Sequence, residues 1–449
     1  MFERESLPLL REALEQMEEG FRALPGFTPA IDVAALRPVL AEAAARMRDN
    51  YPYAHPLYAG QMLKPPHPVA RLAYALALWL NPNNHALDGG RASSAMEQEA
   101  AADIARMLGW EAHLGHLCGG GTMANLEALW VAREVSDTRG VAASAQAHYT
   151  HPRLCGVLGV PFTSVPTDPR GRMDPAALEA ALRRGGIGTV VATLGTTAIG
   201  ACDPLPEILA LRDRHAFRLH VDAAYGGYFA LASGLSPETR RAYDRLAEAD
   251  SVVVDPHKHG LQPYGCGCVL FRDPAVGCVY KHDSPYTYFS SSELHLGEIS
   301  LECSRAGASA VALWATQRLL PLAPGGAFAR GLDRSLEAAR ALHARLRGDR
   351  RFLTTLGPEL DIVVWGAAAG SASASSARAR RVFEEAARED LHLALVDLPA
   401  DWFRGPWPME WDRDTLTCLR SCLMKPEHLP WLDRLWAALD RAADRAAAA

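Results

Sequence analysis

A single lysine follows an apolar run that ends in Asp255-Pro256-His257-Lys258. The chain contains four lysines, at positions 64, 258, 281 and 425, within a total of 46 lysines and arginines. Lysine is required where an amine must lose its proton and condense with an aldehyde, a step that arginine cannot perform. The retention of lysine at this point in an arginine-rich chain therefore favours a chemical role for Lys258, with an ordinary surface lysine as the alternative.

Two further clusters carry groups that suit an anion and a cation. The apolar run 219–221 ends on Asp222 and is followed by small residues, which leave room for a flat ligand. A carboxylate there can bind a metal, act as a base or pair with a cationic ring nitrogen; a helix cap is the alternative. Gly119-Gly120-Gly121-Thr122 precedes a helical pattern, and glycines before a helix N-terminus suit a phosphate group, although a plain turn has the same composition.

Together the three clusters match the needs of one cofactor. Their order is a glycine turn, then a strand ending in Asp222, then a strand leading to Lys258 about 36 residues later. Enzymes that use pyridoxal phosphate (PLP) need a phosphate anchor, a carboxylate for the pyridine nitrogen and a lysine for the aldehyde. The combination therefore predicts a PLP enzyme.

The motifs resemble those of the group II PLP-dependent amino-acid decarboxylases, which have the aspartate-aminotransferase (type I) fold. The likeness spans roughly residues 50 to 435, and the lysine motif is most similar to that of the archaeal tyrosine/aspartate decarboxylase branch. The other motifs that carry it are His55-Pro56-Leu57-Tyr58, Gly120-Gly121-Thr122 with Ala124-Asn125-Leu126, Gly195-Thr196-Thr197 with Asp203-Pro204, and Ser304-Arg305-Ala306-Gly307.

This resemblance implies a role for each matching residue. Lys258 would form the internal aldimine, and Asp222 would pair with the protonated ring nitrogen. Ala224 would pack on one face of the ring and His148 would stack on the other. The expected phosphate contacts are Gly121, Thr122 and His257, with Thr197 on the phenolate side.

The reaction implied is decarboxylation of an L-amino acid to its amine and CO2, through a Lys258 aldimine and a quinonoid intermediate. A carboxy-lyase of this kind must return a proton to Cα. The expected donor is Tyr288, with Tyr286 as second candidate and packing aromatics as the alternative. Other PLP reactions would keep the same residues: aldol-type or phosphate-lyase C–C cleavage, decarboxylating oxidation, or transamination.

Substrate recognition is the least determined part. His55, Tyr58, Arg305 and Arg420 are candidates for substrate binding, with structural salt bridges as the competing interpretation of the two arginines. Glu302-Cys303 departs from the family pattern, since relatives often have glycine before the serine. The family resemblance also implies a homodimer with active sites at the interface, built partly by the N-terminal helix and the 55–58 connector. The sequence does not identify the amino acid.

The elements around these motifs predict an α/β protein. Between about 110 and 275, β-branched runs alternate with helical stretches, which indicates a mostly parallel sheet covered by helices on both faces. Ligands bind at the carboxyl ends of such strands, where the polar clusters lie. We expect an N-terminal helical segment and connector (1–60), a large PLP-binding domain with a seven-stranded sheet (61–322) and a smaller C-terminal α/β domain (323–449). The Gly/Ala/Ser-rich stretch 367–377 reads as a flexible surface loop.

Composition excludes several other classes. The net charge is -6 with no basic block, which argues against nucleic acid as a partner. We find no secretory signal and no apolar stretch of membrane-spanning length, so we expect a cytoplasmic protein with no membrane partner. Nine irregularly spaced cysteines argue against a disulfide framework, and we expect no metal. A zinc hydrolase built on His148/His151 and His257/His259 has no H-E-x-x-H motif and leaves Asp222 unexplained.

Overall fold

The computed structural model describes residues 2–136, 140–281, 294–354 and 357–448. Within these ranges the chain forms a seven-stranded sheet in the order β1-β7-β6-β5-β4-β2-β3. Strands β3, β2, β4, β5 and β6 run parallel, while β7 is antiparallel to both β6 and β1. The strands are β1 (Leu114–Cys118), β2 (Gly140–Ser144), β3 (Phe162–Val165), β4 (Ile187–Thr193), β5 (Arg218–Asp222), β6 (Ser251–Val254) and β7 (Gly267–Phe271).

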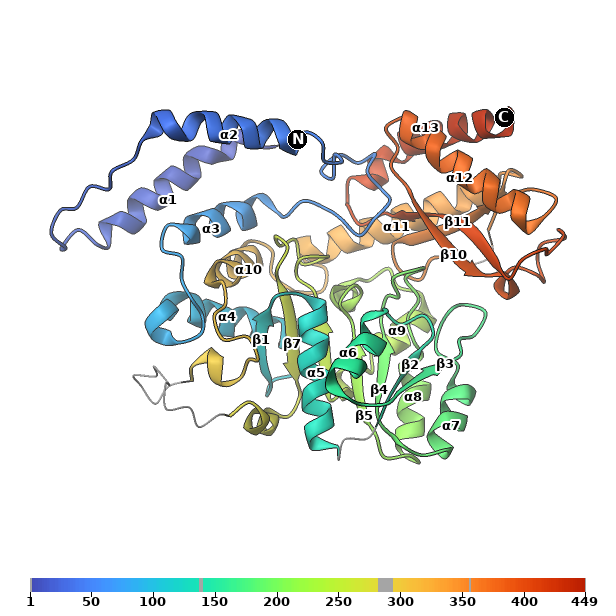
Figure 1. Ribbon diagram of the computed structural model, residues 1–449, viewed down its shortest axis with the longest axis horizontal. Coiled ribbons are helices and arrows are strands. Elements are labelled where there is room, and N and C mark those ends of the chain that lie inside the picture. Colours follow the sequence, from blue (N-terminus) through green and yellow to red (C-terminus); the bar gives the residue numbers. More distant parts are fainter. Residues whose placement is uncertain (1, 137–139, 282–293, 355–356, 449) are drawn as a thin grey trace.

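This sheet is the centre of the large domain, and helices cover it (Figure 1). Strands β4 and β6 are buried along their whole length, as expected for parallel strands with a helical layer on each face. The covering helices are α4 (Leu87–Met107), α5 (Gly121–Val135), α6 (Thr150–Leu158), α7 (Pro175–Arg183), α8 (Leu205–Arg212), α9 (Pro237–Tyr243) and α10 (Gly307–Leu319). The predicted mostly parallel sheet is confirmed.

The smaller C-terminal domain has its own four-stranded antiparallel sheet, in the order β10-β11-β9-β8. Its strands are β8 (Phe352–Leu353), β9 (Ile362–Ala367), β10 (Ala394–Pro399) and β11 (Thr415–Cys422), with helices α11 (Ala327–Arg347), α12 (Ala372–Arg388) and α13 (His428–Ala448). Short 3-10 helices are η1 (Arg4–Ser6), η2 (Gly227–Leu231), η3 (Leu246–Glu248), η4 (Pro274–Val279), η5 (Leu296–Glu298) and η6 (Ala400–Trp402).

One local prediction in this domain was wrong. The stretch 367–377, expected to be a flexible loop, contains the first turns of α12. The Ser371 side chain accepts a hydrogen bond from the Ala374 backbone N–H and so caps the helix. Ala372 and Ser375 are fully buried. Small residues here allow the helix to lie close to the sheet, a use that composition alone does not distinguish from flexibility.

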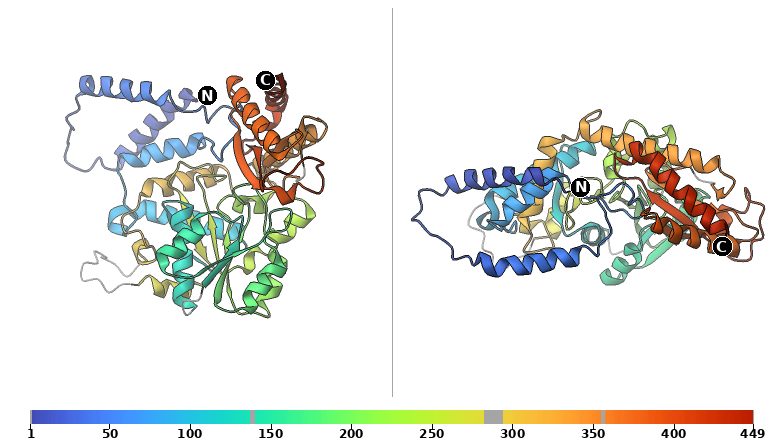
Figure 2. Two further views of the ribbon diagram at one scale, coloured as in Figure 1. Left: turned by 45° about the vertical axis from the view of Figure 1, so that its right-hand side comes forward. Right: turned by 90° about the horizontal axis from the view of Figure 1, so that it is seen from above.

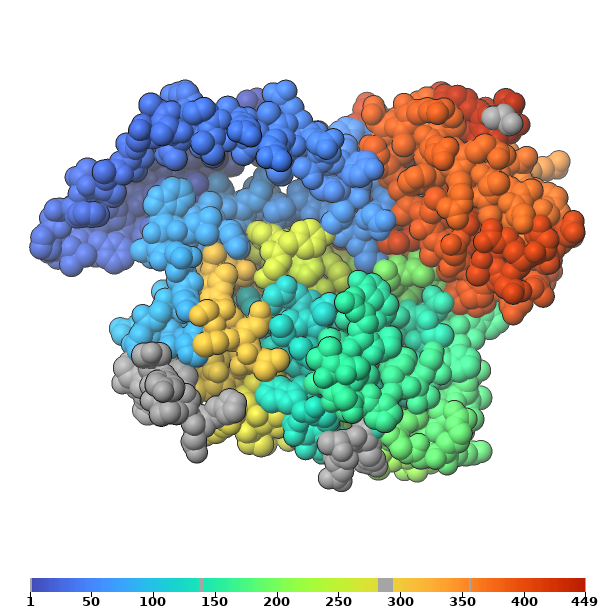
Figure 3. Space-filling model, in the orientation of Figure 1, coloured from blue at the N-terminus to red at the C-terminus, as the bar shows by residue number. Residues whose placement is uncertain are grey.

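The N-terminal segment forms α1 (Leu7–Glu19), α2 (Val33–Met47) and, after an irregular connector, α3 (Pro68–Leu78). Neither α1 nor α2 contains a buried residue. Helix α1 lies along α3, whereas α2 projects from the body in both views of Figure 2, and Figure 3 shows α2 as an arm that stands apart from it. None of the helices in the described part of the chain has the length and apolarity to cross a membrane. The domain boundaries near residues 60 and 322 stay a prediction.

Candidate active site

The glycine turn before α5 is shaped by close backbone packing. Gly120 has a φ of 135°, a conformation that side-chain-bearing residues rarely adopt. A Cβ on Gly121 would lie 2.6 Å from Asp255 Oδ2, so a larger residue would displace that carboxylate. No side chain of the described residues caps α5. The free N–H groups at its start therefore remain available to an anion.

Asn125 ties this turn to the strand that carries the carboxylate. Its side-chain amide donates to Gly121 O at 2.8 Å, and its carbonyl oxygen lies 2.8 Å from His220 Nε2. His220 belongs to β5, two residues before Asp222. The start of α5 and the end of β5 are thus held in a fixed relation.

Asp222 is buried, and its principal side-chain partner is His151. The distance from His151 Nε2 to Asp222 Oδ2 is 2.9 Å, while Asp222 Oδ1 accepts from the Ala224 backbone N–H. Burial alone would raise the pKa of Asp222, but the hydrogen bond and charge of His151, together with Lys258, outweigh it. The pKa therefore lies well below the usual aspartate range, and the carboxylate stays ionised.

Lys258 lies at the turn after β6, with its Nζ 3.0 Å from Asp255 Oδ2. Asp255 is 2% exposed, and its other oxygen, Oδ1, has no hydrogen-bond partner among the described residues. His257 fixes the other side of the turn through Nδ1, 2.8 Å from the Cys266 carbonyl oxygen. The lysine is therefore held by a neighbouring carboxylate at the carboxyl edge of the sheet.

A cavity of about 550 Å³ brings these groups together. It is lined by residues from the carboxyl ends of β4, β5 and β6 and from the start of α5, where the parallel topology predicts a ligand site. The predicted residues that line it are Gly121, Thr122, His148, Thr197, Asp222, Ala224, His257 and Lys258.

His148 is only partly exposed at the cavity. Its Nδ1 accepts a hydrogen bond from the Thr150 backbone N–H at 3.2 Å. Burial lowers the pKa of His148 below the usual value for histidine, and the nearby Lys258 acts in the same direction. A neutral imidazole suits a stacking role against an aromatic ring.

The donor set fits PLP on features of this chain alone. An uncapped helix N-terminus faces the cavity, and the buried Thr193 Oγ1 beside it has no hydrogen-bond partner in the described structure. A Cβ on Gly120 would come within 3.3 Å of His257 Cε1, so glycine keeps this end of the cavity open. The ionised Asp222 lies where a cationic ring nitrogen requires a partner, and Lys258 supplies the amine.

Four other predicted residues do not line this cavity. The guanidinium of Arg305 lies 2.5 Å from Glu97 Oε1 and also donates to the Leu117 and Asn84 carbonyls, in agreement with the salt-bridge interpretation. His55 packs edge-on against Trp431, 4.9 Å between ring centroids. The remaining two residues are Tyr58, below the Lys425 ammonium at 5.3 Å, and Arg420, in β11.

Arg420 is 6% exposed and has no carboxylate partner among the described residues. Its Nη2 donates to Cys422 Sγ at 3.3 Å, and its Nε has no hydrogen-bond partner in the described structure. The other two predicted residues, Tyr286 and Tyr288, lie outside the described residues.

Three site residues received no role in the PLP site that the sequence analysis predicted. His151 contacts Asp222 from 71 positions away, a pairing that no local pattern reveals. Asp255 was part of the lysine motif, and its position three residues before Lys258 is the one available signal. Glu302, noted only as a departure from the family pattern, lines the cavity and accepts a hydrogen bond from the Gly119 N–H at 2.9 Å.

The fold and the cavity define a PLP-binding enzyme of type I fold. Residues 121–367 match the model of the pyridoxal-dependent decarboxylase conserved domain. The chain therefore belongs to the pyridoxal-dependent decarboxylase family, which confirms the predicted family, fold and cofactor.

Named relatives agree with this assignment. The L-tyrosine decarboxylase of Enterococcus faecium is 29% identical over 415 residues, covering 69% of this chain and 68% of that protein. A probable L-aspartate decarboxylase of Halobacterium salinarum is 34% identical over 258 residues, covering 56% of this chain and 70% of that protein. The crystal structure of Oryza sativa TDC with PLP and tryptamine superposes with a TM-score of 0.79 at 19% identity, over 99% of this chain and 97% of that one.

Proposed function

We propose that this chain converts an L-amino acid to its amine and CO2, with PLP held on Lys258. The observation that carries the proposal is the single cavity that gathers Lys258, Asp222, His148 and the Gly121–Thr122 turn. When bound, PLP supplies an electron sink for the electron pair left at Cα after the carboxylate departs.

Each residue has a defined task in this reaction. Lys258 would hold the cofactor through its aldehyde, and Asp255 orients the lysine from 3.0 Å. Asp222 maintains a proton on the ring nitrogen, because a buried carboxylate stabilises a cation most effectively where water is excluded. His148 and Ala224, which both line the cavity, would cover the two faces of the ring. Gly121, Thr122 and His257 would bind the phosphate group of the cofactor. Thr197 would lie near its phenolate oxygen.

The reaction takes up one proton, because the carboxylate leaves as CO2 and a proton must take its place at Cα. We propose Tyr288 as the donor to Cα, with Tyr286 as second candidate, on the resemblance to related decarboxylases. His148 is less suited to this task, since burial lowers its pKa and favours the neutral imidazole, a weaker acid than the imidazolium.

A panel of the twenty amino acids tests the reaction. Purified chain with added PLP is incubated with each one, and CO2, amine, aldehyde and keto acid are measured. Release of CO2 with an equal amount of amine supports decarboxylation. An aldehyde product indicates decarboxylating oxidation, and a keto acid without CO2 indicates transamination; either outcome as the main reaction refutes the proposal. Tyrosine and aspartate come first, because the relatives are named for them.

We propose further that Arg420, although it does not line the cavity in this structure, binds the side-chain carboxylate of an acidic substrate. A buried guanidinium without an acidic partner is costly, and a bound carboxylate would satisfy it. An ion pair between Arg420 and the carboxylate that leaves as CO2 would instead stabilise the substrate before the reaction and so slow decarboxylation. These points favour aspartate over tyrosine.

Changing Arg420→Met should raise KM for aspartate by about 10- to 100-fold, the range expected for a charged hydrogen bond, with a smaller change for tyrosine. Arg420→Lys is the matched variant that keeps the positive charge and should recover part of the loss. Steady-state kinetics on both amino acids provide the measurement. Equal changes for the two substrates would contradict the assignment to the side-chain carboxylate.

We propose that the enzyme is a homodimer in the cytoplasm. All nine cysteines are free, which suits a reducing compartment. On α2, Leu36, Val39 and Leu40 are 51%, 64% and 67% exposed, and they form an apolar patch on an arm that stands apart from the body. A second copy of the chain is the occupant expected, since self-complementary contacts build the commonest oligomers.

Replacing Leu36 and Leu40 together with serine should weaken the dimer by about 100-fold or more, because each buried leucine contributes about 1.5–3 kcal/mol. Light scattering over a concentration series measures the effect. Glu42→Ala, on the same helix, is the polar control and should leave the dimer intact. A fully active monomer of the unaltered chain would contradict the proposal.

A further inference from the structure

A short segment of the small domain places two carboxylates against the large domain. Glu359 and Asp361 lie just before β9, and their exposed fractions are 8% and 0%. Leu360 between them is also buried; a Cβ added to Gly195 would approach its Cδ1 to 3.0 Å. Gly195 lines the active-site cavity. The segment thus lies directly behind the cofactor site.

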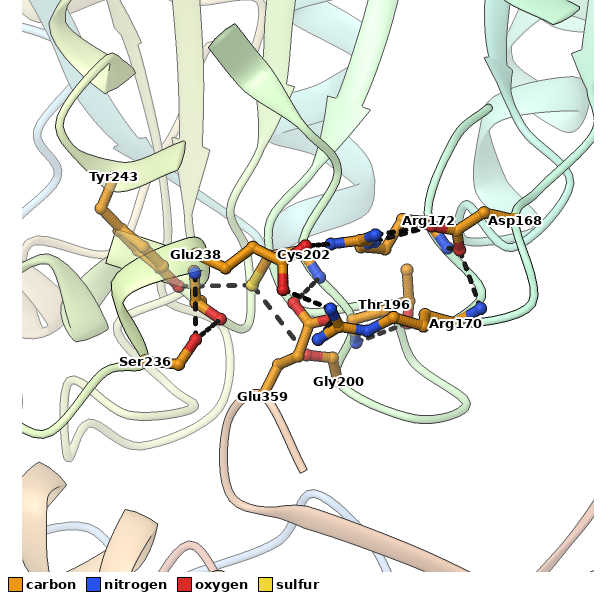
Figure 4. Close-up of polar contacts among 12 residues, drawn as sticks. Asp168, Arg170, Arg172, Thr196, Gly200, Cys202, Ser236, Glu238, Tyr243 and Glu359 are labelled. Atoms are coloured by element: carbon orange, nitrogen blue, oxygen red, sulfur yellow. Dashed lines mark hydrogen bonds and ion pairs between the residues drawn. The ribbon is translucent and has the colours of Figure 1, made fainter. Parts of the chain in front are cut away.

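Glu359 holds the turn that follows β4 (Figure 4). Its Oε2 accepts from the Cys202 backbone N–H at 3.1 Å, and its Oε1 lies 3.2 Å from Arg170 Nη2. The same turn is closed by Thr196, whose Oγ1 accepts from the Ala201 N–H. Thr197, the next residue, lines the cavity. This carboxylate therefore connects the small domain to one wall of the site.

Asp361 connects to the other two turns. Its Oδ1 accepts from the Tyr225 hydroxyl at 2.7 Å, and its Oδ2 lies 3.3 Å from His259 Nε2, although neither Oδ2 nor this Nε2 makes a hydrogen bond in the described structure. Tyr225 lines the cavity and follows Ala224; His259 is the residue after Lys258. One buried carboxylate from the small domain thus contacts both the turn after Asp222 and the turn that carries the lysine.

Titratable groups from several elements surround Asp361. Besides Tyr225 and His259, the charges that act on it or face it are those of Lys64 in the connector and Cys422 in β11. Burial raises the pKa of Asp361 to about 6, while the Tyr225 hydrogen bond and Lys64 oppose the rise. Burial likewise raises the pKa of Glu359. Burying two carboxylates is unfavourable, so their contacts must offset a real cost.

We propose that Asp361 is a positioning residue for the cofactor site: it holds the Tyr225 and Lys258 turns in register from the small domain, with Glu359 doing the same for the Thr197 turn. The ionised carboxylate accepts the Tyr225 hydrogen bond, whereas burial favours the protonated form, so the alignment depends on the protonation state of Asp361. The use of PLP affinity as a readout rests on the proposed function.

The test compares Asp361→Ala, Asp361→Asn and the control Asp433→Asn. Asp433 is a small-domain carboxylate that pairs with Arg345 within that domain, 2.5 Å away. Asp361→Ala should weaken PLP binding to the apoprotein by about tenfold at pH 7.5, as expected for loss of a buried hydrogen-bond partner. Asp361→Asn should restore part of the loss, since its amide oxygen can still accept from Tyr225. The control should match the unaltered chain.

The pH dependence gives a second readout. The ratio of PLP dissociation constants between Asp361→Asn and the unaltered chain should approach one at pH 5, where Asp361 is protonated, and depart from one as the pH rises through 6. A ratio that stays constant between pH 5 and 7.5 would overturn the role of ionisation. The ratio cancels the titration of the phosphate group, which is common to both proteins.

Hydrogen exchange of the apoprotein separates this inference from the proposed function. Asp361→Ala should speed amide exchange in residues 223–227 and 257–261 relative to the control, with no cofactor present. Unchanged exchange in both turns would overturn the positioning role. Faster exchange in a chain that binds no PLP would support the positioning role and refute the proposed function instead.

Discussion

Lys258→Ala is expected to abolish measurable decarboxylation, with kcat lower by a factor on the order of 10⁴ to 10⁶, the range seen when a covalent catalytic group or its partners are removed. The amine of Lys258 is the group that can bond the cofactor's aldehyde at the end of β6, and alanine leaves Asp255 without its partner at 3.0 Å. The visible absorbance of lysine-bound PLP should disappear with the activity.

The control for this experiment is Lys281→Ala, because Lys281 is an exposed lysine that does not line the cavity. It should keep both the absorbance and the activity. Borohydride treatment should fix PLP on the unaltered chain and on this control, and a tryptic digest should locate the label at residue 258. A label at another lysine, or full activity in Lys258→Ala, would refute the assignment.

Asp222→Asn is expected to lower kcat by about 100- to 1000-fold, the range observed for loss of one preorganised electrostatic group. Asparagine has the same shape but does not hold a proton on the ring nitrogen. PLP should still bind, because the lysine and the phosphate turn are unchanged. Steady-state kinetics and absorbance spectra measure the two effects separately.

His151→Gln is the companion variant. His151 contacts Asp222 at 2.9 Å and does not line the cavity, so its loss should reduce kcat less than Asp222→Asn does.

Because the pKa of Asp222 is depressed in the folded chain, its ionised form stabilises the fold above the usual aspartate pKa. That stability is lost only as pH falls through the depressed value. No acid limb of kcat near neutral pH should therefore come from Asp222; an equal kcat for Asp222→Asn and the unaltered chain would refute its role.

Local patterns were sufficient for much of the fold. Strand β5 (Arg218–Asp222) ends on Asp222, as the apolar run 219–221 predicted. The start of α12 was missed because alanine and serine pack tightly in a buried helix as readily as they form a loop. Propensity alone does not decide between these outcomes; the neighbouring sheet does.

For the candidate site too, local motifs predicted some features and missed others. Lys258, Asp222 and the Gly121–Thr122 turn were predicted because each ends or begins a regular element and bears a distinctive group. The contacts that hold them were not, because the partners are remote: Asp361 lies 136 residues from Tyr225. A carboxylate that leads into a small-domain strand has no local feature that predicts its contact with the large domain. Long-range electrostatic pairing is visible only once the chain is folded.

The scarcity of lysine has a practical consequence for labelling. Of the four lysines, Lys425 is 3% exposed and donates to the His55 and Tyr58 carbonyls, Lys64 is half-buried, and the Lys258 side chain is 22% exposed beside Asp255. Lys281 alone among them is exposed. Guanidinium groups stay protonated and do not acylate under mild conditions. Among the lysine side chains, an amine-reactive dye should therefore attach mainly at Lys281, which gives a side-chain handle for fluorescence or surface immobilisation without engineered cysteines.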